Sequence, residues 1–133
     1  MTVDFKKYTE FVDEVTSDAS KDADYFTESC EIIEEQGVQP ERILTAAIGI
    51  TAEGGEFAEI IKKCFFQGKA FDEDVQYHAK RELGDIMWYI AQACIALDIT
   101  IDDVIETNIE KLEARYPGGF DAYLSENRKD GDI

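Results

Sequence analysis

Two long stretches of the chain carry apolar residues at every third or fourth position, which is the spacing of one face of an α-helix. In the stretch from Pro40 to about Gln67, that face comprises Ile43, Ala47, Ile50, Gly54, Phe57, Ile61 and Cys64. In the stretch from about residue 72 to 97, it comprises Leu83, Ile86, Met87, Ile90, Cys94 and Leu97. No segment alternates apolar and polar residues as a half-buried strand does. The pattern predicts an all-α chain built on two long helices.

Shorter helical patterns flank these two stretches. Residues 4 to 17 predict an amphipathic helix, and residues 20 to 39 predict a helical turn or short helix that ends near Gly37. Thr100 followed by Asp103 matches a capping box, which predicts a last helix that stops at Pro117. From about residue 121 to 133 we expect a polar, frayed tail. Together these features predict one domain over residues 1–133, a bundle of four to five helices.

The charge balance narrows the range of partners. Thirty acidic residues against thirteen basic ones give a formal net charge of −17. Nucleic acids and anionic membranes require faces rich in lysine and arginine, so we expect neither as a partner. Nucleotides remain compatible with this charge, because metal ions can carry it. The three cysteines show no metal-ligand spacing, and the first residues open no apolar leader, so we expect a cytoplasmic protein.

Two acidic couples lie beside the apolar faces of the long helices: Glu53-x-x-Glu56 and Glu82-x-x-Asp85. Residues three apart on a helix point the same way, so antiparallel packing would gather four carboxylates into one cleft. Crowded carboxylates raise one another's pKa, and a hard divalent cation relieves the repulsion. Mg²⁺, with Mn²⁺ as an alternative, prefers carboxylate oxygens and bridges to phosphates. The spacing predicts a metal site for phosphorylated substrates.

Acidic couples of this spacing also occur without any metal. In so acidic a chain, pairs such as Glu110 and Glu113 arise by chance on solvated helix faces. The central couples differ because they border the apolar faces and because Gly54 and Gly55 interrupt the first one. Each glycine costs roughly 1 kcal/mol relative to alanine within a helix, which predicts a close backbone approach there. The single histidine, His78, excludes a two-histidine metal site and is interpreted as an ordinary helix residue.

At this point the motifs resemble a known family. Glu53-Gly-Gly-Glu56, a spacer of 25 residues, and Glu82-Leu-Gly-Asp85-Ile-Met-Trp-Tyr are similar to the all-α nucleoside triphosphate pyrophosphohydrolases of the MazG type. The run from Asn108 to Phe120, which includes Arg115-Tyr-Pro-Gly-Gly, resembles the final helix of that family and its exit. The resemblance extends over about residues 44 to 128.

The resemblance implies a reaction. Glu53, Glu56, Glu82 and Asp85 would hold Mg²⁺ against a triphosphate, and water would attack the α-phosphorus. The products would be a nucleoside monophosphate and pyrophosphate. Glu56 is our choice for the residue that assists the water, because it lies furthest from the apolar face.

The resemblance also implies a set of phosphate-binding side chains: Asn108, Lys111, Arg115 and Lys63. Lys111 would supply a point charge, with Asn108 one turn earlier on the same helix face. For Arg115 the alternative is a cation that favours the helix C-terminus, and for Lys63 it is a solvated side chain. Members of this family usually complete their bundle with a neighbouring copy, so we expect a homodimer or homotetramer.

Two competing interpretations stay open. A dUTP- or alarmone-directed relative would share the acidic motif and differ in its base pocket. A non-catalytic acidic protein that mimics DNA would need carboxylates dispersed at phosphate-like spacing. That interpretation gives no reason for Gly54 and Gly55, or for Asn108, Lys111 and Arg115 in one line. The preferred base and sugar are not determined by these motifs.

Overall fold

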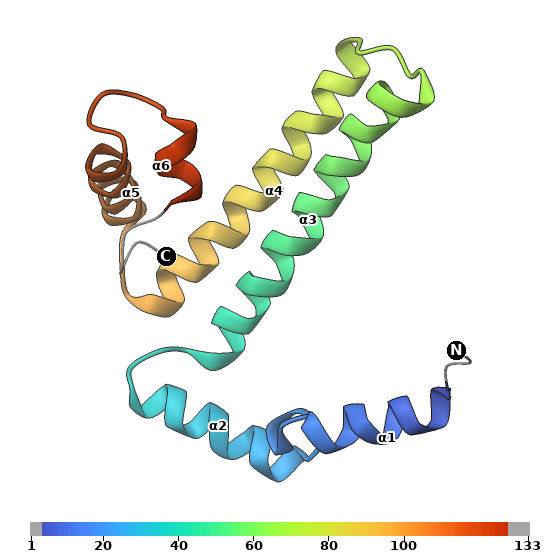
Figure 1. Cartoon of the computed structure of the whole chain (residues 1–133). Coiled ribbons are helices and arrows are strands. Elements are labelled where there is room, and N and C mark those ends of the chain that lie inside the picture. The colour runs from blue at the N-terminus through green and yellow to red at the C-terminus, as the bar shows by residue number, and fades with distance from the viewer. Residues whose placement is uncertain (1–3, 128–133) are drawn as a thin grey trace. The chain divides into compact units, whose positions relative to one another are not determined.

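A computed structural model describes residues 4–127, and this part of the chain is all-α (Figure 1). Its helices are α1 (Phe5–Val15), η1 (a 3-10 turn, Asp18–Ser20), α2 (Ala23–Glu35), α3 (Pro40–Gln67), α4 (Glu73–Leu97), α5 (Ile101–Arg115) and α6 (Ala122–Glu126). No strand occurs among the described residues, where the only β feature is an isolated bridge between Pro117 and Gly119. The predicted all-α class is confirmed.

The chain divides into two compact units, Met1–Glu41 and Arg42–Ile133. The first unit contains α1, η1 and α2. The second contains nearly all of α3 together with α4, α5 and α6. A single domain over residues 1–133 stays a prediction.

Side-chain caps explain where most of the helices begin. Thr100 and Asp103 form the predicted capping box: the Asp103 N–H donates to Thr100 Oγ1 at 3.1 Å, and the Thr100 N–H donates to Asp103 Oδ2 at 2.8 Å. The Thr100 hydroxyl also donates to Asp103 Oδ2 at 2.6 Å, and this hydrogen bond, followed by the one from the Thr100 N–H, lowers the pKa of Asp103. A cap of this kind contributes about 1 kcal/mol to helix stability.

One predicted feature needs correction. The stretch from residue 121 was expected to be a polar, frayed tail, but it contains α6. Asp121 caps this helix, because its carboxylate accepts a hydrogen bond from the Leu124 N–H at 3.0 Å. The expected fraying beyond Asn127 lies outside the described residues.

The helices α3 and α4 run side by side in opposite directions (Figure 1). Gly68 ends α3 in the left-handed region at φ 71°, and Asp72 begins α4 by accepting a hydrogen bond from the Val75 N–H at 3.0 Å. At the other end of the pair, Arg42 Nη1 donates to the Gln92 side chain at 2.6 Å. A short turn thus joins the two helices at one end, and a side-chain hydrogen bond links them at the other.

α3 lies close to a side chain of α4 at Gly49, which is buried. A Cβ atom at this position would overlap the ring of Tyr89. Around Gly54 and Gly55, in contrast, nothing within 4 Å would meet an added Cβ. The predicted close approach at Gly54 and Gly55 is therefore wrong for the described part of the chain, and Gly49 has that role.

The buried core is small. Its hydrophobic members are Ala46, Val75, Ala79, Cys94 and Ala96, of which Val75 is the largest that is fully buried. The predicted apolar faces are only partly covered: Leu83 and Met87 on α4 are each 49% exposed. On α5 every large apolar residue is exposed, namely Ile101, Val104, Ile105, Ile109 and Leu112.

Across residues 4–127, no single helix has the length and apolar character needed to cross a membrane. The pair α4 and α5 passes that test only when joined across a bend of 98°, and by length and composition alone.

We predict that Gly49→Ala lowers the free energy of unfolding by about 1–3 kcal/mol, because the new methyl group overpacks the Tyr89 ring. Gly54→Ala is the matched control on the same helix. Its methyl group enters open space, so the better helix propensity should raise stability by up to about 1 kcal/mol. Denaturant unfolding followed by circular dichroism measures both, and equal effects would contradict the packing described for Gly49.

Candidate metal centre

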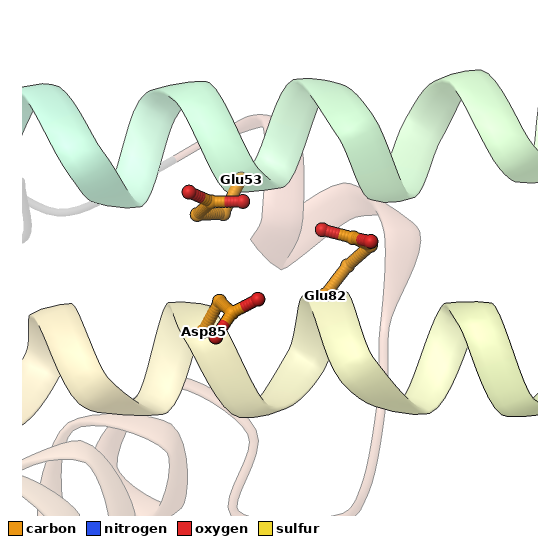
Figure 2. A group of neighbouring side chains, drawn as sticks. All are labelled: Glu53, Glu82 and Asp85. Atoms are coloured by element: carbon orange, nitrogen blue, oxygen red, sulfur yellow. The ribbon is translucent and has the colours of Figure 1, made fainter.

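Three carboxylates meet between α3 and α4. Glu53 comes from α3, and Glu82 and Asp85 come from α4, where their spacing of three places them on one face. One carboxylate oxygen of each lies within 4.8 Å of the others. Figure 2 shows the three side chains pointing into the space between the two helices. Glu53 and Glu82 are half-buried and Asp85 is exposed.

Partial burial and neighbouring negative charge both act on the carboxyl group of Glu53. Its partial burial is the main cause of a raised pKa, and the charges of Glu56, Asp85 and Glu82 add to it. A hydrogen bond with the Glu82 side chain raises the Glu53 pKa further. Desolvation and like charges both disfavour the ionised form. Without a cation, this arrangement therefore disfavours the ionised form of Glu53.

The donor set fits a hard divalent cation. All three groups offer carboxylate oxygens, and no histidine or cysteine belongs to the group among the described residues. Mg²⁺ and Mn²⁺ prefer such oxygens, whereas softer metals prefer imidazole or thiolate ligands. A bound cation would also remove the repulsion that raises the pKa of Glu53. Glu53, Glu82 and Asp85 can therefore hold Mg²⁺.

The fourth acidic residue of the sequence motif occupies a different position. Glu56 lies outside the group of three, one turn further along α3, where it lines a cavity of about 390 Å³. Glu82 belongs to both the carboxylate group and the cavity wall, so the two adjoin. The residues that line the cavity are Ala52, Gly55, Glu56, Glu59, Ile60, Lys63, Lys69, His78 and Glu82.

The second glycine of the motif has a steric role here. Gly55 lines the cavity, and a Cβ atom at this position would meet open space. The missing side chain therefore keeps the cavity wide beside Glu56.

Lys63, which the sequence predicts to bind phosphate, lies in the wall of the cavity. Its Nζ is 3.5 Å from Glu59 Oε1. Lys62 also pairs with Glu59. The hydrogen bond from Lys62 is the main reason that the pKa of Glu59 is lowered, and the charges of both lysines contribute.

Sequence reasoning misses two basic residues of the cavity wall, Lys69 and His78. His78, interpreted from the sequence as an ordinary helix residue, precedes Glu82 by four positions and therefore shares its helix face. That spacing is the signal that the sequence offers. Lys69 lies in a loop, where no periodic pattern indicates which way a side chain points.

The predicted phosphate ligands of α5 are not brought to this site. Asn108, Lys111 and Arg115 line neither the cavity nor the carboxylate group in the part of the chain that is described. Asn108 and Lys111 are exposed, while the half-buried Arg115 guanidinium lies 5.9 Å from the centre of the Tyr116 ring. Their contact with substrate stays a prediction.

Comparison with known proteins finds a matching family model and a similar phage protein. The sequence model of the MazG nucleotide pyrophosphohydrolase domain matches residues 41–120, which contain all four acidic residues of the motif. The chain is also 32% identical to the Gene 37 protein of Mycobacterium phage L5 over 82 residues, which are 61% of this chain and 72% of that protein. No solved structure matches the chain.

The raised pKa of Glu53 gives a prediction for stability without metal. The folded state holds this proton more tightly than the unfolded chain. The resulting stabilisation is therefore complete below the ordinary glutamate pKa and is lost as pH rises through the raised pKa. We predict that Glu53→Gln raises the melting temperature of the metal-free protein at neutral pH and changes it little near pH 4, roughly the ordinary glutamate value.

When the melting temperatures are measured with Mg²⁺, the unaltered chain should be more stable than Glu53→Gln. At about 100 times its Kd, Mg²⁺ should add about 2.7 kcal/mol to the stability of the unaltered chain and much less to Glu53→Gln. Glu110→Gln, an exposed change on α5, is the control and should behave as the unaltered chain does. Equal stabilisation of all three proteins by Mg²⁺ would contradict a metal centre at Glu53.

Proposed function

The chain belongs to the MazG nucleotide pyrophosphohydrolase family, and we propose that it hydrolyses nucleoside triphosphates, canonical or modified, to a nucleoside monophosphate and pyrophosphate. The observation that supports this most is the meeting of Glu53, Glu82 and Asp85 beside a cavity with charged walls. Dispersed acidic residues, as a DNA mimic needs, would not produce such a group.

In this proposal, the residues of the site have separate roles. Glu53, Glu82 and Asp85 hold Mg²⁺, which when bound offsets phosphate charge and makes water more acidic. Glu56 accepts the proton of the attacking water, because it is exposed on the cavity wall one turn from Glu53. A general base must first lie within reach of the proton, and the cavity position meets that condition. Lys63 contacts a phosphate from the same wall.

We further propose that the protein acts as a homodimer or homotetramer. The apolar stripe of α5 is exposed along its length, and α5 contains no buried residue. Covering such a stripe against another copy would remove apolar area from water at roughly 25 cal/mol per Å². Asn108, Lys111 and Arg115 lie on this helix, so an interface along α5 would place them next to a neighbouring copy.

Hydrolysis is tested by pyrophosphate release from a panel of ribo- and deoxyribonucleoside triphosphates, with Mg²⁺ and with EDTA. We expect release only with metal, and a loss in kcat/KM of at least about 100-fold for Glu56→Ala and Glu82→Gln. Glu110→Ala, on α5 outside the site, should keep full activity. Release that persists in EDTA, or in Glu82→Gln, would contradict the assignment of the site. Activity restricted to dUTP, or to an alarmone tested beside the panel, would narrow the substrate class.

The oligomer is tested by size-exclusion chromatography with light scattering. The unaltered chain should have the mass of two or four copies, and Ile105→Asp should shift it to a smaller species with its helicity retained. Thr107→Asp adds the same charge on the opposite side of α5 and should leave the mass unchanged. A monomer for the unaltered chain at micromolar concentration would contradict the proposal.

A further inference from the structure

The wall of the cavity beside the carboxylate group carries both acidic and basic side chains. Six of its nine lining residues are ionisable, and the remaining three are the small or aliphatic residues Ala52, Gly55 and Ile60. In the described part of the chain, no phenylalanine, tyrosine or tryptophan lines it, and the imidazole of His78 is its one ring. Three of the ionisable side chains are acidic, and three can carry positive charge: Lys63, Lys69 and His78.

The end of α3 places Lys69 beside Lys63. Gly68 turns the chain at φ 71°, and the Lys69 N–H then donates to the Lys63 carbonyl at 3.2 Å. This hydrogen bond holds the Lys69 backbone against the last turns of α3, on the side of the cavity. Lys63 is paired with Glu59, whereas Lys69 has no ion pair with any residue in the described ranges. The Lys69 ammonium group is therefore available to an anion in the cavity.

His78 adds a third basic residue to the cavity wall, from α4. It lies on α4 four residues before Glu82, and both side chains line the cavity. Its Nε2 is 3.5 Å from Asp74 Oδ1, and its ring lies 5.9 Å from that of Tyr77, measured between centroids. The cavity wall thus includes Glu82 of the carboxylate group together with basic residues from α3, α4 and the loop between them.

We propose that Lys69 and His78, together with Lys63, bind the two phosphates that leave as pyrophosphate. This inference rests on the proposed function and adds the orientation of the substrate in the site. With the α-phosphate at the carboxylates, the β- and γ-phosphates extend into the cavity towards the three basic groups. Charge-assisted hydrogen bonds to phosphate are the strong ones, so these contacts favour a triphosphate over a diphosphate.

The first test measures binding without turnover. Isothermal titration calorimetry of inorganic pyrophosphate with Mg²⁺, on the full chain, should show affinity about tenfold weaker in Lys69→Ala and in His78→Gln. Lys62→Ala is the matched control, because Lys62 also pairs with Glu59 but does not line the cavity. It should leave the affinity unchanged, and Lys69→Arg should keep most of it. Circular dichroism establishes that each variant is folded.

The second test follows from the orientation. Lys69→Ala should lower kcat/KM for a triphosphate about tenfold and should change hydrolysis of the matching diphosphate much less. Equal pyrophosphate affinity in Lys69→Ala and Lys62→Ala, or no pyrophosphate binding by the unaltered chain, would overturn the inference. A change in KM without a change in pyrophosphate affinity would also overturn it, by assigning Lys69 to another part of the substrate.

The two proposals can fail separately. If the unaltered chain hydrolyses nucleotides but its pyrophosphate affinity does not depend on Lys69, the function stands and the inference is wrong. If the chain hydrolyses none of the nucleotides but binds pyrophosphate through Lys69, the binding site stands and the proposed reaction is wrong.

Discussion

The packing of α3 against α4 brings three carboxylates together, and this crowding of negative charge is the constraint on which the site depends. Glu53, Glu82 and Asp85 repel one another, and the raised pKa of Glu53 reflects that repulsion as well as its partial burial. Elsewhere in the hairpin, the Tyr89 ring lies against Gly49, and Arg42 donates a hydrogen bond to Gln92. A cation bound between the carboxylates would relieve their repulsion.

Much of the fold follows from local rules that act within a few residues. Helix periodicity and the Thr100–Asp103 capping box predict the long helices and the start of α5. The short helix α6 is missed because the polarity of its stretch outweighs the single capping signal of Asp121. Spacing of three also predicts that Glu82 and Asp85 share a face. It does not predict that Glu53 meets them while Glu56 does not, because that depends on how α3 is rotated against α4.

Residues outside periodic elements are the hardest to predict. Lys69 reaches the cavity through a helix-ending turn at Gly68, and a sequence pattern does not determine the direction of a side chain in such a turn. The glycines of the first motif are misinterpreted for a related reason. Helix propensity indicates that Gly55 has a cost, but only the structure shows that the space beside it is a cavity. Periodicity likewise identifies the apolar faces without saying what covers them, as the exposed stripe of α5 demonstrates.

The proposed reaction depends on attack of water at the α-phosphorus beside the carboxylate group. The most direct measurement is a reaction of a nucleoside triphosphate with Mg²⁺ in water that carries a heavy oxygen isotope, with the products analysed by mass spectrometry. We expect the heavy oxygen in the nucleoside monophosphate and none in the pyrophosphate. Heavy oxygen in the pyrophosphate, or in free phosphate released with a nucleoside diphosphate, would contradict the proposed reaction.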